Sequence, residues 1–223
     1  MAIAILVGGS AVSEQQQTAA IYAAGAARVV VVLGVIVFAA IHIERLIETR
    51  EIEAILSHAI SRSKFLIGYW LGLSLVVASI IAPVGALVAW LAIERMGALL
   101  WTASMLMEGL IVVAFAMFAG LTFARSVPTV FATVGFYALA RSLGFLTGIT
   151  SSVYRSQTGT NEVLNPYIDF LALVLPRLDL FSQSAWLIYD LEPVLIWILP
   201  VQTLLYVALL LFAADFDLRR RRF

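Results

Sequence analysis

Three ionisable residues lie deep inside apolar stretches of the sequence, and they are Arg28, Glu108 and Arg141. Each would cost about 2.5–3.5 kcal/mol at the centre of a membrane, so each needs a partner or water. Glu108 lies ten residues after Ala98 and Arg141 nine residues before Thr150, which is about 15 Å and about 14 Å of helix. Arg28 falls at a similar depth. The matching depths predict that Glu108 pairs with Arg141, with Arg28 nearby.

Two roles fit such a cluster: a polar lining or gate on a path across the membrane, or a buried ion pair that fixes helix packing. Covalent catalysis has little support elsewhere in the chain. Lys64 stands in SRSKFL without the glycines of a phosphate-binding loop, so ATP hydrolysis is not expected. His42 and His58 lie 16 residues apart and form no H-E-x-x-H zinc motif. Cysteine is absent, and no G-x-S-x-G elbow occurs. We expect a chain that is not an enzyme and binds no metal or cofactor itself.

A second polar region lies between residues 44 and 64. It carries an apolar stripe at i, i+3, i+4, i+7 and i+8, formed by Ile52, Ile55, Leu56, Ala59 and Ile60. This spacing predicts an amphipathic helix along the membrane surface. The opposite face is polar and holds Glu51, Glu53, Ser57, His58, Ser61 and Arg62. The helix is either a topological anchor or a docking surface.

The composition places these features in a membrane. Of the 223 residues 62% are apolar and 13% are charged, against roughly 45–50% and about 25% in soluble domains. A soluble protein of this size lacks the polar shell to cover so much apolar surface. The 14 basic and 14 acidic residues balance to a net charge of zero, which argues against a nucleic-acid partner.

The spanning elements follow from apolar length, since a bilayer core needs about 20 residues of helix. Five stretches suffice: Thr18–Ile43, Phe65–Ile93, Ala98–Ala124, Val127–Thr150 and Pro193–Ala214. Met1–Val12 is apolar but too short, and we expect it to be the outer end of a partial first span. The fold class is therefore an all-α polytopic bundle, with residues 1–223 forming one transmembrane domain.

Basic residues give the orientation. Arg45, Arg50, Arg62 and Lys64 share one loop, Arg125 lies in another, and Arg219–Arg222 end the chain. Short basic loops face the cytoplasm, so the C-terminus is expected inside and the protein in the plasma membrane. The terminal arginines either bind anionic lipid or only fix this orientation. The alternate connections then face out: Ser13–Gln17, Glu94–Gly97 and Ser151–Glu192.

The long outer connection contains an apolar run, Asn165–Asp190, that is interrupted by Pro176, Arg177 and Asp179. These groups would sit at the centre of any single span, so a clean span is excluded. We expect two short helices at the outer interface, anchored by Trp186 and Tyr189, although an ordinary interfacial loop also fits.

The run Glu44–Gly72 resembles the cytoplasmic loop of permease subunits of ABC-2 type exporters. In that family an acidic segment leads into a pattern close to l-l-S-x-P-[IV]-S-R, followed by G-K-x-x-G at the head of the next span. The positions that match are Leu56, Ser57, Ile60, Ser61, Arg62, Gly68 and Gly72. Ala59 stands where proline is usual, and Tyr69 where lysine or arginine is usual.

The resemblance implies a six-span permease that works as a homo- or heterodimer above ATP-binding subunits, which would hold the ATP and Mg²⁺. It makes the inner helix a coupling element, with a docking surface of Glu48, Arg50, Glu51, Glu53, Ser57, His58, Ser61 and Arg62. It makes residues 151–192 an external gate region. Gly68 and Gly72 would allow another helix to pack closely. The alternative is a membrane scaffold that docks some other cytoplasmic protein through the same helix.

Overall fold

The structure, a computed structural model, describes residues 2–56, 61–92, 94–151, 170–171, 174–187 and 195–220. For residues 2–20 and a few positions elsewhere it describes the backbone only. Within these ranges the chain is helical and has no strand. The elements are α1 (Ala2–Glu48), α2 (Glu51–Leu56), α3 (Arg62–Leu91), α4 (Arg95–Phe123), α5 (Ser126–Ser151), the 3₁₀ turns η2 (Leu180–Ser182) and η3 (Ser184–Leu187), and α7 (Leu195–Arg220).

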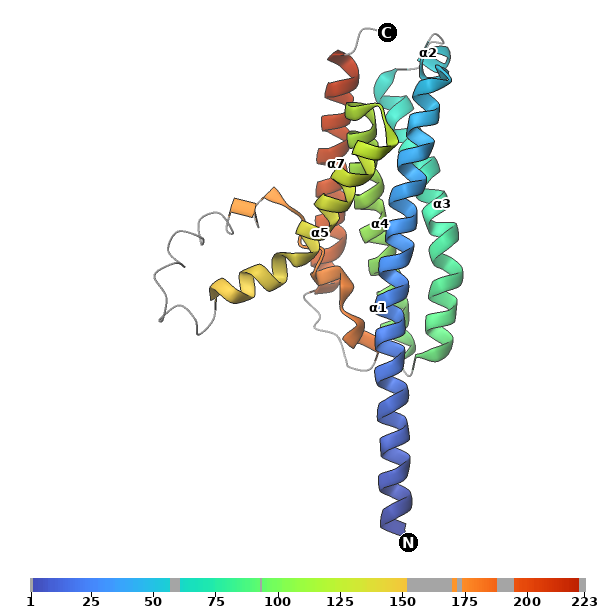
Figure 1. Ribbon diagram of the computed structural model, residues 1–223, viewed down its shortest axis with the longest axis vertical. Helices are drawn as coiled ribbons and strands as arrows, with labels where there is room; N and C mark the ends of the chain where they lie inside the picture. Colours follow the sequence, from blue (N-terminus) through green and yellow to red (C-terminus); the bar gives the residue numbers. More distant parts are fainter. Residues whose placement is uncertain are drawn as a thin grey trace.

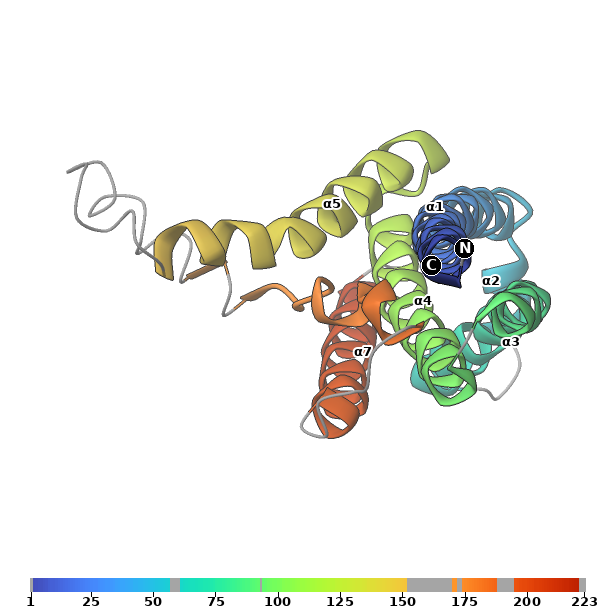
Figure 2. The same cartoon turned by 90° about the horizontal axis from the view of Figure 1, so that it is seen from below.

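Five of these helices are long and apolar enough to cross a membrane, which confirms the predicted all-α bundle. Their apolar segments are Ile21–Glu48, Arg62–Trp90, Arg95–Phe123, Ser126–Thr147 and Trp197–Arg220. Helices α1, α3, α4 and α7 run side by side along the long axis, whereas α5 crosses the bundle and leans away from it (Figures 1 and 2).

Helix α4 is the centre of the bundle. In its most apolar stretch of 18 residues 61% of the residues are buried, against 28–39% in the corresponding stretches of the other four. It contacts α1, α3, α5, α7 and both 3₁₀ turns. Small residues permit this close packing: a Cβ at Gly109 would lie 2.8 Å from Cγ1 of Val77, and one at Gly120 would lie 2.8 Å from Cγ2 of Ile43. Side chains that α4 directs into the bundle are therefore packed against several other elements.

The N-terminal region differs from the prediction of a separate partial span. The backbone is one continuous helix from Ala2 to Glu48, without the expected outer loop at Ser13–Gln17. Ser13–Gln17 contains no glycine or proline, and its glutamate and glutamines favour helix. At 47 residues the helix is about 70 Å long, so one long helix replaces the predicted loop between two spans.

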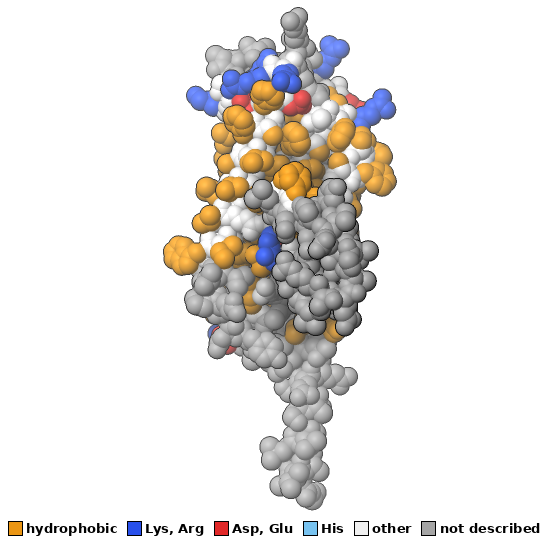
Figure 3. Space-filling view, turned by 90° about the vertical axis from the view of Figure 1, so that its left-hand side faces the viewer, with side chains coloured by type: hydrophobic (Ala, Val, Ile, Leu, Met, Phe, Trp, Pro, Cys, Tyr) orange, Lys and Arg blue, Asp and Glu red, His pale blue; other side chains and the backbone are white. Residues whose placement is uncertain are grey.

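One end of the bundle gathers the three basic segments that the sequence assigned to a common side. Helix α2, the α4–α5 turn and the C-terminal end of α7 lie there together (Figure 1), and most of the coloured Lys and Arg side chains of the visible face do too (Figure 3). The charged end borders an apolar band. The grouping agrees with the predicted topology, while the side of the membrane that this end faces stays a prediction.

The α4–α5 turn contains a residue in a left-handed conformation. Ala124 caps α4 with φ 56°, and its N–H donates to the carbonyl of Gly120 at 2.9 Å. A Cβ makes this conformation unfavourable by roughly 1–2 kcal/mol, and glycine removes that penalty.

We therefore expect Ala124→Gly to stabilise the protein by about 1 kcal/mol, seen as a higher midpoint of thermal unfolding in detergent. The matched control is Ala138→Gly in the right-handed interior of α5, where glycine should lower stability by about 1 kcal/mol. Equal effects of the two substitutions would contradict the strained cap.

Candidate functional site

The buried centre of the bundle is an ionic cluster around Arg28 of α1. Its side chain is fully buried, and Nη1 donates to Oε2 of Glu108 at 3.0 Å. Nη2 donates to the hydroxyl of Ser104 and to the carbonyl of Trp101, both at 2.9 Å. The guanidinium carbon also lies 4.7 Å from the ring centroid of Trp101, within the range of a cation–π contact. Helix α4 thus holds Arg28 with a carboxylate, a hydroxyl, a carbonyl and an aromatic face.

The second cation of the cluster comes from α5. Nη1 of Arg141 donates to the other carboxylate oxygen of Glu108, Oε1, at 3.2 Å and to the hydroxyl of Tyr137 at 2.9 Å. The Glu108 side chain is fully buried, whereas that of Arg141 is 27% exposed. One carboxylate therefore bridges two guanidiniums, and through them it joins α1, α4 and α5. The predicted pairing of Glu108 with Arg141 is present, and Arg28 makes the more deeply buried contact.

The segment before α7 closes the cluster from one side. The backbone carbonyl of Phe181 accepts a hydrogen bond from Nη1 of Arg28. Leu178 and Phe181 are fully buried, and Trp186 is buried as well. The expected short helices before the last span are thus two 3₁₀ turns that insert into the bundle. The buried position of Trp186 contradicts its predicted role as an interfacial anchor. Tyr189 lies outside the described residues, and the interfacial placement of the short helices stays a prediction.

Two glycines allow this segment to approach α4 and α5. A Cβ at Gly97 would overlap the carbonyl oxygen of Trp186, and one at Gly144 would overlap the carboxylate of Asp179. Asp179 also accepts a hydrogen bond from Nη2 of Arg177 at 2.9 Å. The charged residues that exclude a clean span here therefore pair with each other at the edge of the bundle.

The electrostatics make the cluster rigid. Removing charges from water costs several kcal/mol per ion even after relaxation, so each must keep its partners. Glu108 is shared by two arginines, which leaves an excess of one positive charge within this group of three. Among the described residues Nε of Arg28 and Nε1 of Trp101 have no hydrogen-bond partner. The arrangement can act as a lock between three spanning helices and the described residues before α7, 174–187, which we call the Phe181 segment. Alternatively it can interact with a charged group that passes through.

The predicted docking surface is only partly described. Glu48, Arg50 and Glu51 are exposed where α1 ends and α2 begins. The side chain of Glu53, together with Ser57 and His58, lies outside the described residues. Ile52 of the predicted apolar stripe is buried, and Ile55 packs against the same core.

The last two residues of the predicted docking surface have roles within the fold. Ser61 caps α3 by accepting a hydrogen bond from the backbone N–H of Lys64. Nη1 of Arg62 donates to the carbonyl of Leu218 in α7 at 2.7 Å. Both residues therefore help to fix the start of α3, and Arg62 joins it to α7.

Gly68 and Gly72 do not form the predicted close helix contact with any described part of the chain. Both are exposed on α3, and a Cβ at either would meet nothing within 4 Å. They border a hollow of about 540 Å³ between α1 and α3, next to His42 and Tyr69. The periodicity of α3 directs this face away from α4, whereas Val77 faces Gly109.

Sequence reasoning missed Trp101, Ser104, Tyr137 and the carbonyl of Phe181, which surround the predicted charges. Trp101, Ser104 and Glu108 are spaced i, i+3 and i+7, and Tyr137 precedes Arg141 by four residues. Such spacings place side chains on one face of a helix, so the signal was present in the sequence. No sequence signal pointed to the Phe181 carbonyl, because every residue carries one.

No family model, curated protein or solved structure matches this chain.

Proposed function

We propose that this chain is the membrane-spanning permease subunit of an ATP-driven exporter of the ABC-2 type in the plasma membrane. It would pair with a second permease subunit and with ATP-binding subunits that supply the hydrolysis. The proposal rests on the resemblance of Glu44–Gly72 to the cytoplasmic loop of that family and on the charged turn between α1 and α2. We call this turn, residues 48–51, the elbow. The elbow is a suitable docking point, because its exposed charged side chains adjoin a residue that is buried in the core of the bundle.

The elbow is the observation that carries the proposal. Arg50 has a left-handed backbone with φ 56°, and this residue turns the chain sharply between two helices. Exposed Glu48 and Glu51 flank it. Directly below, Ile52 is buried in one core cluster with residues of α1, α3, α4 and α7. A force applied to the elbow would therefore move spanning helices rather than a loose loop.

Helix α1 links the elbow to the ionic cluster. From Glu48 to Arg28 there are 20 residues of uninterrupted helix, a distance of about 30 Å. Rigid helices that shift as units are a common means of carrying conformational change. In the proposed cycle a shift of α1 would change how Arg28 holds Glu108 and the Phe181 carbonyl.

The Phe181 segment would then act as a gate on the side away from the elbow. It is bound to α1 through Arg28 and contacts α4 through Gly97 and Trp186. Moving it aside requires breaking a hydrogen bond to a buried guanidinium, so its opening depends on the position of α1. The cluster is thereby assigned the gate role, and its packing role follows from the same contacts.

Charge reversal at the elbow tests the coupling. We expect Glu48→Arg together with Glu51→Arg to weaken copurification with the ATP-binding subunit and to lower stimulation of its ATPase at least about tenfold, since two favourable contacts would become repulsive. The partner to test is a nucleotide-binding subunit encoded beside this chain. The control is Glu94→Arg, which changes another exposed glutamate, at the other end of the bundle.

Three outcomes are distinct. Loss of ATPase stimulation in the elbow variant alone supports the permease. Full stimulation by the elbow variant contradicts the docking surface. Stable binding of a cytoplasmic protein without any ATPase activity in the complex would favour the scaffold that uses the same elbow.

A further inference from the structure

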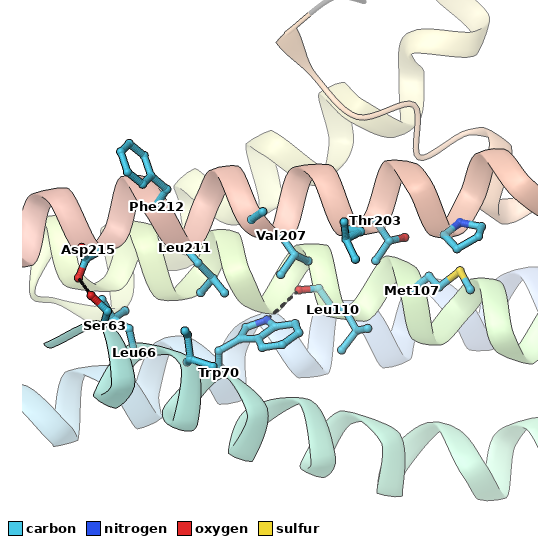
Figure 4. Close-up of a pocket in the computed structure, with 14 residues that line it drawn as sticks. Ser63, Leu66, Trp70, Met107, Leu110, Thr203, Val207, Leu211, Phe212 and Asp215 are labelled. Carbon is cyan, nitrogen blue, oxygen red and sulfur yellow. Dashed lines mark hydrogen bonds between the residues drawn. The ribbon is translucent and has the colours of Figure 1, made fainter. Parts of the chain in front are cut away.

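A long groove runs between α3 and α7, with α4 as its floor (Figure 4). Its volume is about 670 Å³. Most of its lining is apolar and includes Leu66, Trp70, Leu110 and Val207, which point into the space between the helices. Trp70 is fixed there, because its Nε1 donates to the carbonyl of Leu110 at 3.4 Å. The groove opens to the outside of the bundle between α3 and α7.

The dimensions of the groove suit one hydrocarbon chain. It extends along α7 from Asp215 to Pro200, fifteen residues or about 22 Å, which exceeds the roughly 15 Å of one leaflet's hydrocarbon. Its polar lining is confined to Ser63 and Asp215 at one end and Thr203 further along. The remaining apolar length therefore matches an extended acyl chain.

The end of the groove at the basic pole is polar. Ser63 donates to Oδ1 of Asp215 at 2.9 Å, and Nε of Arg219 donates to Oδ2 at 2.7 Å. Nη2 of Arg219 also donates to the Ser63 hydroxyl at 3.2 Å. Asp215 and Arg219 thus form an ion pair in which the guanidinium is the exposed member, since the side chain of Arg219 is 64% exposed and that of Asp215 16%. The mouth presents a guanidinium to the headgroup region of the membrane.

We propose that this groove binds an anionic glycerophospholipid of the adjoining leaflet. One acyl chain lies along Trp70 and Val207, and the phosphate contacts Arg219. The apolar lining takes the chain, and the exposed guanidinium selects the charge of the headgroup. This assignment is independent of the proposed export function, because it concerns a lipid that the protein holds and not one that it moves.

Tryptophan fluorescence tests the site directly. Trp70 lines the groove, Trp101 and Trp186 are buried, and Trp90 and Trp197 are exposed on the outside. In a Trp90→Phe, Trp197→Phe background, the full chain is placed in phosphatidylcholine nanodiscs with increasing phosphatidylglycerol that carries dibrominated acyl chains. We expect quenching that saturates at a low fraction of the brominated lipid. Quenching proportional to the bulk lipid fraction overturns the site.

Two variants, each with a matched control, test the apolar part of the groove and its polar end separately. Ala208→Phe would fill the groove from an exposed position and should abolish saturable quenching, whereas Leu205→Phe, outside the groove, should not. Arg219→Gln should raise the half-saturating lipid fraction about fivefold, the equivalent of about 1 kcal/mol for one basic residue near an anionic surface. Its control is Arg220→Gln, since Arg220 stacks on Phe216 instead. Equal half-saturation with brominated phosphatidylcholine overturns the charge selection.

Discussion

Replacing Glu108 by glutamine is expected to prevent most of the protein from folding, and what folds should unfold at a much lower temperature. The carboxylate holds Arg28 at 3.0 Å and Arg141 at 3.2 Å. Glutamine has a similar shape but no charge, so two guanidiniums would face each other across a neutral amide. Breaking a buried ion pair by removal of one partner costs about 3–5 kcal/mol. That is a large share of the usual 5–15 kcal/mol of total stability.

The measurement is the yield of monodisperse protein and its thermal unfolding midpoint in detergent. Glu94→Gln serves as the control, because it makes the same chemical change at an exposed position and should have little effect. A Glu108→Gln protein as stable as the parent would show that the cluster is not needed for the fold.

A double substitution separates charge from packing. Arg28→Met with Glu108→Met removes one buried cation together with its counter-ion, and leaves without a carboxylate only Arg141, whose side chain is 27% exposed. Replacement of a whole ion pair by apolar residues is often nearly neutral, unlike the loss of one member. We expect the double variant to lose less stability than the sum of the two single substitutions, as for groups in direct contact. Transport should still fail if the cluster is the gate, because the Phe181 carbonyl loses its donor.

The ionic cluster could be predicted because a membrane leaves buried charges few options. Equal depth on three helices was sufficient to bring Glu108 to Arg141. Which of the two arginines is more deeply buried was not predictable, since their burial depends on the rotation of α1 and α5 about their axes. Helix α5 leans away from the bundle (Figure 2), which leaves Arg141 partly exposed, whereas Arg28 points into α4.

The glycines show a second limit to what could be predicted from the sequence. Gly68 and Gly72 match a small-xxx-small spacing but face open space, while Gly97, Gly109 and Gly120 take the close contacts. The spacing alone identifies a surface that another backbone can approach. Whether one does depends on where helices cross, and crossing points are set by the whole bundle.

The burial of Trp186 was not predicted, because the sequence of the segment before α7 suits two environments. An apolar run broken by Pro176, Arg177 and Asp179 can lie at an interface or insert into a bundle. The difference is made by a backbone acceptor, the carbonyl of Phe181, and by a missing side chain at Gly97. Neither is visible as a polar or apolar pattern, so tryptophan was assigned its usual interfacial place.

The same contact gives the second large effect that we expect, from Gly97→Ala. The added methyl group would overlap the carbonyl oxygen of Trp186. This oxygen belongs to the backbone, so no side-chain rotation can make room, and the turn at Ser184–Leu187 must shift away from α4. Overpacking of this kind costs about 1–3 kcal/mol. Because Phe181 lies only five residues earlier, we expect its hydrogen bond to Arg28 to weaken and the segment to open.

A cysteine reporter measures this opening, since the natural chain has none. Ser182→Cys is nearly isosteric, and residue 182 is partly buried beside Phe181. An impermeant maleimide should label it about tenfold faster when Gly97→Ala is also present, equivalent to about 1.4 kcal/mol of easier opening. Gly135→Ala is the control, because a Cβ there meets nothing within 4 Å. Labelling in the Gly97→Ala protein that is no faster than in this control would mean that the Phe181 segment is not held by the contact at Gly97. The gate would then need another hinge.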